Sequence, residues 1–310
     1  MSDSIDHKEL FFKPGVSPTS INDFFECPAK FWRYSSLNPN KEKKEATPAM
    51  IFGRLVHCMV LTPESFESDF AVEPVKTSEL ETIDDMRSIL ALHGVVLKSS
   101  AKKSDYIVAV NQVAPQAKFW QIELETFKQN AGRRTIVTKE QYDLARSMQE
   151  AMFRNAKVKQ LIGNGYSEEP FCWFPDCPEG LMRKVKLDYI RQGLVIEYKT
   201  AEEPDPERFE REIGERSYHR QLAMQIDACT RRYGEAPHGA IIIAQDKEYH
   251  DDICITAVNA PALTVGAEEV EYAFQQITER LKTGNWKKFA EDIKPIGLPR
   301  YYQPKHIQRA

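Results

Sequence analysis

The sequence predicts an α/β protein with a mainly helical N-terminal part. Helical spacing of apolar residues dominates positions 76–162, whereas short β-patterned runs recur from about residue 168 onward. The order is helices, then strands, a helix, further strands and a last helix, which is typical of an α/β core preceded by helices. The sequence contains no internal repeat and no low-complexity block.

The composition is typical of a soluble globular protein. Of the 310 residues, 42% are hydrophobic and 28% are charged, which is enough apolar surface for a substantial core. No apolar run approaches the ~18 residues that a membrane span needs, and the polar, acidic N-terminus does not resemble a signal peptide. These features predict a cytoplasmic protein.

Charge and cysteine content limit the kinds of site that we expect. The net charge of −4 does not indicate a nucleic-acid-binding protein. Contacts with DNA would therefore need local basic patches or metal ions. The six cysteines are scattered, which predicts free thiols. Only Cys172 and Cys177 lie close together, and their spacing does not match a zinc or iron–sulfur site.

Changes in composition divide the chain into four segments. They are a loose leader at 1–16, a mainly helical part at 17–165, a strand-rich core at 166–290 and a basic, Pro-rich tail at 291–310. The helical part should begin with a helix at 17–32 that Thr19 or Ser20 caps. A second helix at 50–61 should end before Thr62-Pro63, and a longer helical pattern covers 138–162.

The strand-rich core contains a predicted hairpin, followed by elements at 204–233 (helical), 239–245 and 252–258 (strands) and 267–282 (helix). In the hairpin, residues 184–190 and 194–200 are the strands. Residues 191–193 form a three-residue turn, in which Gly193 suits the left-handed position. Because side chains alternate along a strand, Glu197 and Lys199 share one face.

The register of this hairpin decides the role of Asp188. Simple pairing across the turn places Asp188 opposite Ile196, whereas a one-residue bulge places it opposite Glu197. Two adjacent carboxylates repel each other unless a divalent cation such as Mg²⁺ or Mn²⁺ lies between them. Lys199 would then point at the group that the metal binds, and the three residues together would form a site for phosphodiester hydrolysis.

A simpler interpretation stays open from these residues alone. Glu-x-Lys occurs by chance in a charged chain, and a second copy, Glu42-x-Lys44, lies in a solvated, turn-rich stretch. Glu197 and Lys199 would then be surface charges of an ordinary strand that form a cross-strand pair.

Asp188 followed by Glu197-x-Lys199 across a hairpin resembles the motif of the PD-(D/E)XK nuclease superfamily. GRLVHCMVLTPESF at 53–66 is similar to the G-x-x-x-H-x-x-x-L-x-P block of RecE-type exonucleases, and SPTSINDFFECPAKFW at 17–32 resembles the opening block of RecB-family nucleases. Three later stretches also resemble these nucleases in order and spacing: EYKTAEEPDPERFER, SYHRQLAMQIDAC and IGLPRYY. The resemblance covers about residues 17–302.

The resemblance implies a restriction-endonuclease-like fold, in which helices flank a central mixed β-sheet. It also implies a site for Mg²⁺, with Mn²⁺ as a substitute. Asp188 and Glu197 would bind the metal, the backbone carbonyl of Tyr198 would join them, and His57 would reach the metal from the helical part.

The same resemblance assigns Lys199 as the catalytic lysine and Gln221 as a glutamine that holds the site or the DNA end. Tyr218 would pack against the site or orient its side chains, and either Glu168 or Glu169 would add an acidic group. The sequence departs from the family in three places. Lys186-Leu187 precede the aspartate where Arg-Pro is usual, Tyr198 follows the acidic residue where an aliphatic residue is commoner, and Gln225 stands where the helix motif has tyrosine.

The activity implied is that of a DNA exonuclease that degrades the 5′-ended strand of linear duplexes in a bacterial or phage-infected cell. The 3′ overhangs would serve a single-strand annealing protein, and the enzyme would form a ring-like homo-oligomer. The competing hypotheses are an endonuclease or single-strand nuclease on the same fold, and a silent module that binds DNA or a protein.

Overall fold

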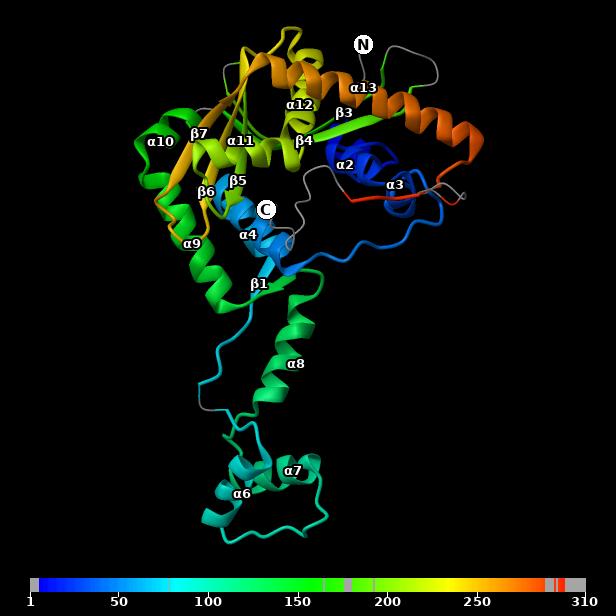
Figure 1. The fold of residues 1–310 in the computed structure, drawn as a ribbon. Helices are drawn as coiled ribbons and strands as arrows, with labels where there is room; N and C mark the ends of the chain where they lie inside the picture. Colours follow the sequence, from blue (N-terminus) through cyan, green and yellow to red (C-terminus); the bar gives the residue numbers. More distant parts are fainter. Residues whose placement is uncertain are drawn as a thin grey trace, which may run out of the picture.

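A five-stranded mixed sheet forms the centre of the described part of the molecule (Figure 1). The computed structural model describes residues 6–77, 79–163, 165–175, 180–191, 193–287, 293 and 295–298. The spatial order of the strands is β3-β4-β5-β6-β7, and only β5 and β6 run parallel. The strands are β3 (Tyr166–Trp173), β4 (Arg183–Arg191), β5 (Leu194–Ala201), β6 (Gly239–Asp246) and β7 (Ile253–Val258).

Helices cover both faces of the sheet, so the predicted α/β class is confirmed. One face carries α2 (Pro18–Glu26), α11 (Pro206–Glu215), α12 (Tyr218–Tyr233) and α13 (Ala260–Thr283). The other face carries α4 (Pro48–Leu61), α9 (Lys139–Arg154) and α10 (Ala156–Ile162). The pair α11 and α12 connects the parallel strands β5 and β6, as a crossover between parallel strands requires.

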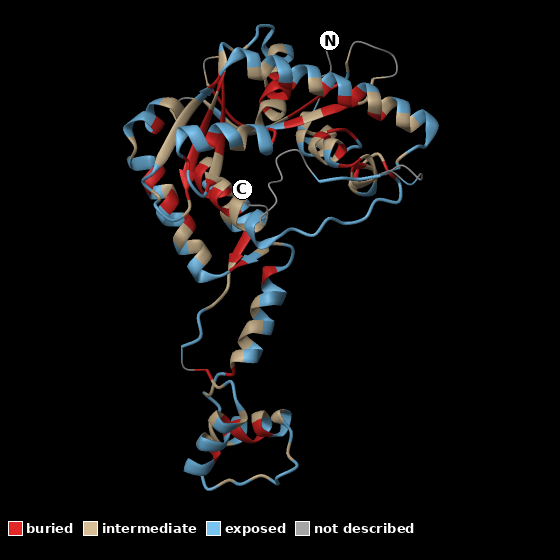
Figure 2. Cartoon of the chain, viewed as in Figure 1, coloured by how far each residue is buried: buried red, intermediate tan, exposed pale blue. Residues whose placement is uncertain are grey.

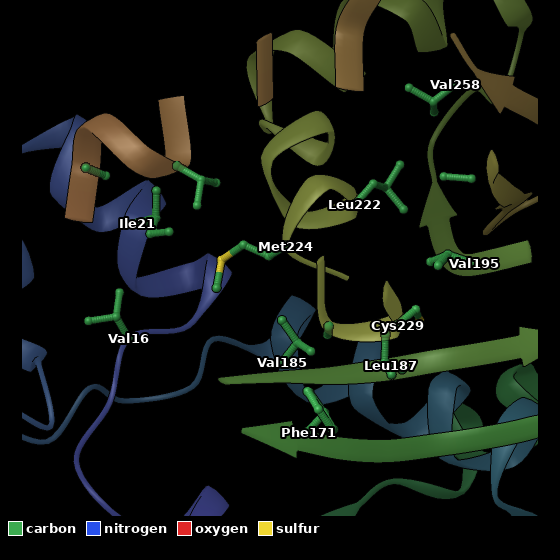
Figure 3. Close-up of a cluster of buried hydrophobic side chains, with 14 of the residues drawn as sticks. Val16, Ile21, Phe171, Val185, Leu187, Val195, Leu222, Met224, Cys229 and Val258 are labelled. Carbon is green, nitrogen blue, oxygen red and sulfur yellow. The ribbon is translucent and has the colours of Figure 1, made fainter. Parts of the chain in front are cut away.

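Two hydrophobic clusters hold these layers together, one on each face of the sheet. Figure 3 shows part of the first, where Leu222 and Met224 of α12 lie near Val185 and Leu187 of β4. In the second, Ile196 and Tyr198 of β5 pack against the buried side of α4. Side chains of β5 therefore alternate between the two clusters, and Figure 2 shows buried residues on both sides of the sheet.

The helical N-terminal part is built onto the core and is not a separate unit. Because α4 contributes Leu55 and Val56 to the same cluster as Ile196, the core needs both parts of the chain. The remaining elements of this part are α3 (Pro28–Tyr34), α5 (Phe66–Asp69), β1 (Phe70–Val72) and β2 (Thr135–Val137). A 3₁₀ turn, η1 (Pro63–Ser65), follows α4 at the predicted end of that helix.

The helix predicted over 17–32 is two helices, because Cys27 is extended before Pro28 and separates α2 from α3. Ser17 caps α2 by accepting the N–H of Ser20, so the expectation that Thr19 or Ser20 would cap was wrong. The pattern over 138–162 divides in the same way at Asn155, whose side chain caps α10.

The leader predicted at 1–16 is ordered from His7 onward, where α1 (His7–Phe11) begins. The Nδ1 atom of His7 accepts the N–H of Cys172 at 3.3 Å. Val16 is fully buried and forms a β-bridge with Arg183. Residues 1–5 lie outside the described part, as does most of the predicted tail at 291–310.

A helical arm extends from the core between β1 and β2 (Figure 1). It contains α6 (Ile83–Leu92), α7 (Lys103–Val113) and α8 (Trp120–Ala131). The arm has a small hydrophobic cluster of its own, centred on Met86, Leu90 and Val110. Within the described residues, no helix is long and apolar enough to cross a lipid bilayer.

Candidate active site

The turn between β4 and β5 is shorter than predicted and fixes the register of the hairpin. Arg191 pairs directly with Leu194, and Tyr189 pairs with Ile196. A two-residue turn therefore replaces the predicted three-residue loop, with Gly193 in the predicted left-handed conformation at φ +75°. The same register continued by one step aligns Asp188 with Glu197, without the bulge that we expected for that outcome.

Pairing between β4 and β5 is confined to the three residue pairs next to the turn, and Asp188 lies just beyond them. Its Oδ2 atom accepts the backbone N–H of Tyr198 at 3.0 Å, so a side chain takes the place of a backbone partner. The same oxygen lies 3.6 Å from Nδ1 of His57 on α4. Asp188 thus connects the hairpin to the helix on one face of the sheet.

Glu197 connects the hairpin to the helix on the other face. Its side chain is 1% exposed, and its Oε1 atom accepts hydrogen bonds from Nζ of Lys199 and Nε2 of Gln221. Its Oε2 atom accepts a hydrogen bond from Nε2 of Gln225 at 2.7 Å. Gln221 and Gln225 are one helical turn apart on α12, so the two amides hold the two oxygens of one carboxylate.

The two carboxylates are held in conditions that disfavour their charge. Burial raises the pKa of Asp188, although Lys199 and the Tyr198 N–H act in the opposite direction. Burial and then the charge of Asp188 raise the pKa of Glu197, against the effect of Lys199. A pair of this kind becomes more favourable when a cation binds between its members.

Lys199 is a cation in this environment. Burial opposes its charge, but Glu197 and Asp188 outweigh burial and hold the pKa of the ammonium above its ordinary value. The amine lies 5.0 Å from the ring centroid of Tyr218 and 3.3 Å from Oε1 of Gln221. In the metal-free protein Lys199 therefore donates a hydrogen bond to Glu197.

His57 is neutral at pH 7. Burial is the main cause that lowers its pKa to about 4, and the charge of Lys199 adds to that effect. The ring lies 5.1 Å from that of Tyr198 in an edge-on arrangement. A neutral imidazole keeps a lone pair, which is the form that binds a metal.

The donor set fits a hard divalent cation that keeps part of its water shell. Among the described residues, no three His, Cys, Asp or Glu side chains form a ready ligand cluster. Mg²⁺ is usually bound by one or two carboxylates together with water and substrate phosphate, so Asp188 and Glu197 are a sufficient protein contribution. Gln225 also has a buried Oε1 atom without a hydrogen-bond partner, as expected beside a site that holds further ligands.

The structure brings together His57, Asp188, Glu197, Tyr198, Lys199 and Gln221. Glu169, offered as a further acidic group, is instead bound to Arg232 near the C-terminal end of α12. The side chain of Glu168 lies outside the described part. Tyr198 also donates its hydroxyl to Oε1 of the buried Gln245, which anchors the strand behind the site.

Gln225 is the residue whose place in the site the sequence interpretation missed. It was treated as a departure from a motif that has tyrosine at this position, yet it is 1% exposed and contacts Glu197 directly. The signal that could have found it is its spacing, since residues i and i+4 lie on one face of a helix.

Two solved structures match this chain over 86% of their own lengths. A solved structure described as "Putative exonuclease" from Eubacterium rectale is 14% identical over 92% of this chain and 86% of that chain, with a TM-score of 0.48. The solved structure of SSO0001 is 12% identical over 62% of this chain and 86% of that chain, with a TM-score of 0.26.

No curated protein matches the sequence. A family model described as a PDDEXK-like domain of unknown function, DUF3799, matches residues 17–296, which include every residue of the site above. The match covers most of the chain, from α2 to beyond the end of α13. The chain therefore belongs to this PDDEXK-like family.

Proposed function

We propose that the protein is a metal-dependent DNA exonuclease that degrades the 5′-ended strand of linear duplexes and leaves 3′ overhangs. The observation that carries a metal-dependent nuclease is the convergence of Asp188, Glu197 and Lys199 at one point of the β4–β5 hairpin. The 5′ polarity and the 3′ overhang come from the RecE-type resemblance. An ordinary strand would gain nothing from burying two carboxylates whose pKa values are both raised.

Each group has a defined task in this proposal. A divalent cation, when bound by Asp188 and Glu197, supplies an activated water and balances the charge of the phosphate. The ammonium of Lys199 donates a hydrogen bond to the reacting phosphate or to the attacking water. Gln221 and Gln225 keep the Glu197 carboxylate in one orientation, and neutral His57 supports Asp188 from α4.

The test is digestion of linear duplex DNA labelled separately at the 5′ and the 3′ end, with Mg²⁺ and with EDTA. We expect metal-dependent loss of the 5′ label by the wild type and no loss with Lys199→Ala. Cleavage of closed-circular DNA would favour an endonuclease, and cleavage of single strands alone would favour a single-strand nuclease. No cleavage of any DNA with any metal would leave a module that only binds.

The partners follow from the RecE-type resemblance and belong to the same proposal. We propose a ring-like homo-oligomer around DNA, a single-strand annealing protein that receives the overhang, and a cytoplasmic location in a bacterial or phage-infected cell. Light scattering of the purified protein tests the first, because a monomer in solution would contradict a ring.

A further inference from the structure

A pocket of about 460 Å³ that contains several charged side chains opens beside the proposed metal site. Its charged and polar lining comes from two elements of the helical part and from β4, namely Arg54, His57, Thr62, Asp69 and Lys186. The mechanism proposed above uses only His57 among these residues. The other side chains therefore need an explanation of their own.

The pocket is continuous with the carboxylate site. His57 belongs to both, because it lines the pocket and lies 3.6 Å from Oδ2 of Asp188. Lys186 is two residues before Asp188 on β4, and Arg54 is three residues before His57 on α4. These spacings place both cations on the same faces of their elements as the two site residues.

The charge of the pocket suits a multivalent anion. Arg54 is exposed and carries a fixed positive charge. Lys186 of β4 lines the same pocket. Two cations thus face one carboxylate, Asp69, in a space that also offers the Thr62 hydroxyl. A phosphate group, with several acceptor oxygens, is the ligand that these donors recognise best.

We propose that Arg54 and Lys186 bind a second phosphate group of the DNA strand, next to the phosphate that reacts at Asp188 and Glu197. This inference rests on the proposed function, because the strand must enter the site. The second phosphate has two possible sources: the terminal 5′-phosphate of the strand, or the internal phosphodiester next to the one that is cut. Both offer phosphate oxygens to the same donors, so the experiment separates them.

The test measures equilibrium binding of short fluorescent duplexes in EDTA, over a range of salt concentrations, for the wild type and its variants. Arg54→Ala should weaken binding about tenfold and lower the slope of log Kd against log salt by about 1. Asp69→Asn should strengthen binding, since it removes the negative charge of the pocket lining. Arg146→Ala is the matched control, because Arg146 is exposed on α9 and paired with Glu150.

Three duplexes identify the source: one with a 5′-phosphate, one with a 5′-hydroxyl, and one with a 5′-hydroxyl and a neutral methylphosphonate at the terminal linkage. If the wild type binds the 5′-phosphate duplex more tightly than the 5′-hydroxyl duplex and Arg54→Ala does not, the pocket binds the terminal phosphate. If the methylphosphonate weakens DNA binding by the wild type but not by Arg54→Ala, the pocket binds the internal linkage.

The inference is overturned if Arg54→Ala and Asp69→Asn both bind DNA like Arg146→Ala. That result leaves the proposed nuclease intact when the wild type still cleaves linear duplexes. A wild type that neither cleaves nor binds DNA overturns both proposals. Because Arg54 and Asp69 are exposed, we expect both variants to melt within a few degrees of the wild type, roughly as for other surface changes.

Discussion

Tyr198 donates its backbone N–H to the carboxylate of Asp188 at 3.0 Å, across a hairpin whose own pairing stops one residue earlier. The gap that this contact bridges is where the candidate metal site lies. His57 approaches it from one face of the sheet, and Gln221 and Gln225 approach Glu197 from the other. The site is therefore built from three layers, namely the hairpin in the sheet and the helices on its two faces.

Asp188→Asn should raise the thermal stability of the metal-free protein. The pKa of Asp188 is raised by burial, so its charge costs free energy in the folded state, and a neutral isostere avoids that cost. The measurement is the melting temperature at pH 7 in EDTA and with Mn²⁺. The wild type should gain stability with Mn²⁺ and the variant should not. A variant that responds to Mn²⁺ like the wild type would remove Asp188 from the ligand set.

Gln225→Met should weaken binding of Mn²⁺ by about 10-fold to 100-fold, which is the usual effect of losing a group that orients a metal ligand. Methionine conserves the volume of the side chain but cannot donate to Oε2 of Glu197. Calorimetric titration with Mn²⁺ measures the effect without any DNA. Gln129→Met, on the exposed side of α8, serves as the control. Equal affinities of the two variants would show that Gln225 only fills space.

Lys199→Met should keep Mn²⁺ binding and lose at least about 100-fold in cleavage rate, because the ammonium acts on the phosphate or the water and not on the metal. The readouts are calorimetry and the rate of loss of the 5′ label. Lys199→Arg, which keeps the positive charge, should retain part of the activity. Cleavage by Lys199→Met at the wild-type rate would exclude the lysine from the reaction.

Glu271→Gln should lower stability by about 0.5–1 kcal/mol at neutral pH, a small value because the carboxylate is 54% exposed. Its bidentate partner Arg183 lowers the pKa of Glu271, so the stabilisation is present above the unfolded pKa of about 4.3. It is lost as the pH falls through the lower folded pKa. Melting curves of both proteins should differ above pH 5 and converge near pH 2. A constant difference would exclude this ion pair as the cause.

The sequence was sufficient to predict the elements whose signals are local. The strands at 239–245 and 252–258 and the helix at 50–61 correspond to β6, β7 and α4, with differences of one or two residues at their ends. Helix breaks were missed where a single residue, Cys27 or Asn155, decides between a continuous and an interrupted helix. Such breaks depend on single capping residues, and their signal in the sequence is weaker than the helical spacing of apolar residues around them.

The site was predictable only in part, for a related reason. Alternation along a strand was enough to place Glu197 and Lys199 on one face. Asp188 joined them in only one of the two registers that the sequence allowed. The register depended on whether the turn has two or three residues, and that depends on packing. Gln225 contacts Glu197 from a distant element, and only its spacing of four residues from Gln221 pointed to that contact. The pocket of Arg54 and Lys186 also joins distant elements, and no local pattern specifies it.

The arm between β1 and β2 should have a lower free energy of opening than the central sheet. Its cluster consists of its own residues, and its link to the core is two strands of three residues each. The arm should therefore open as one cooperative unit while the central sheet stays closed. Native-state hydrogen exchange should resolve two opening free energies, the lower for α6 and α7 and the higher for β5 and α12. The β4–β5 hairpin would then keep its geometry through motions that unfold a sizeable part of the chain.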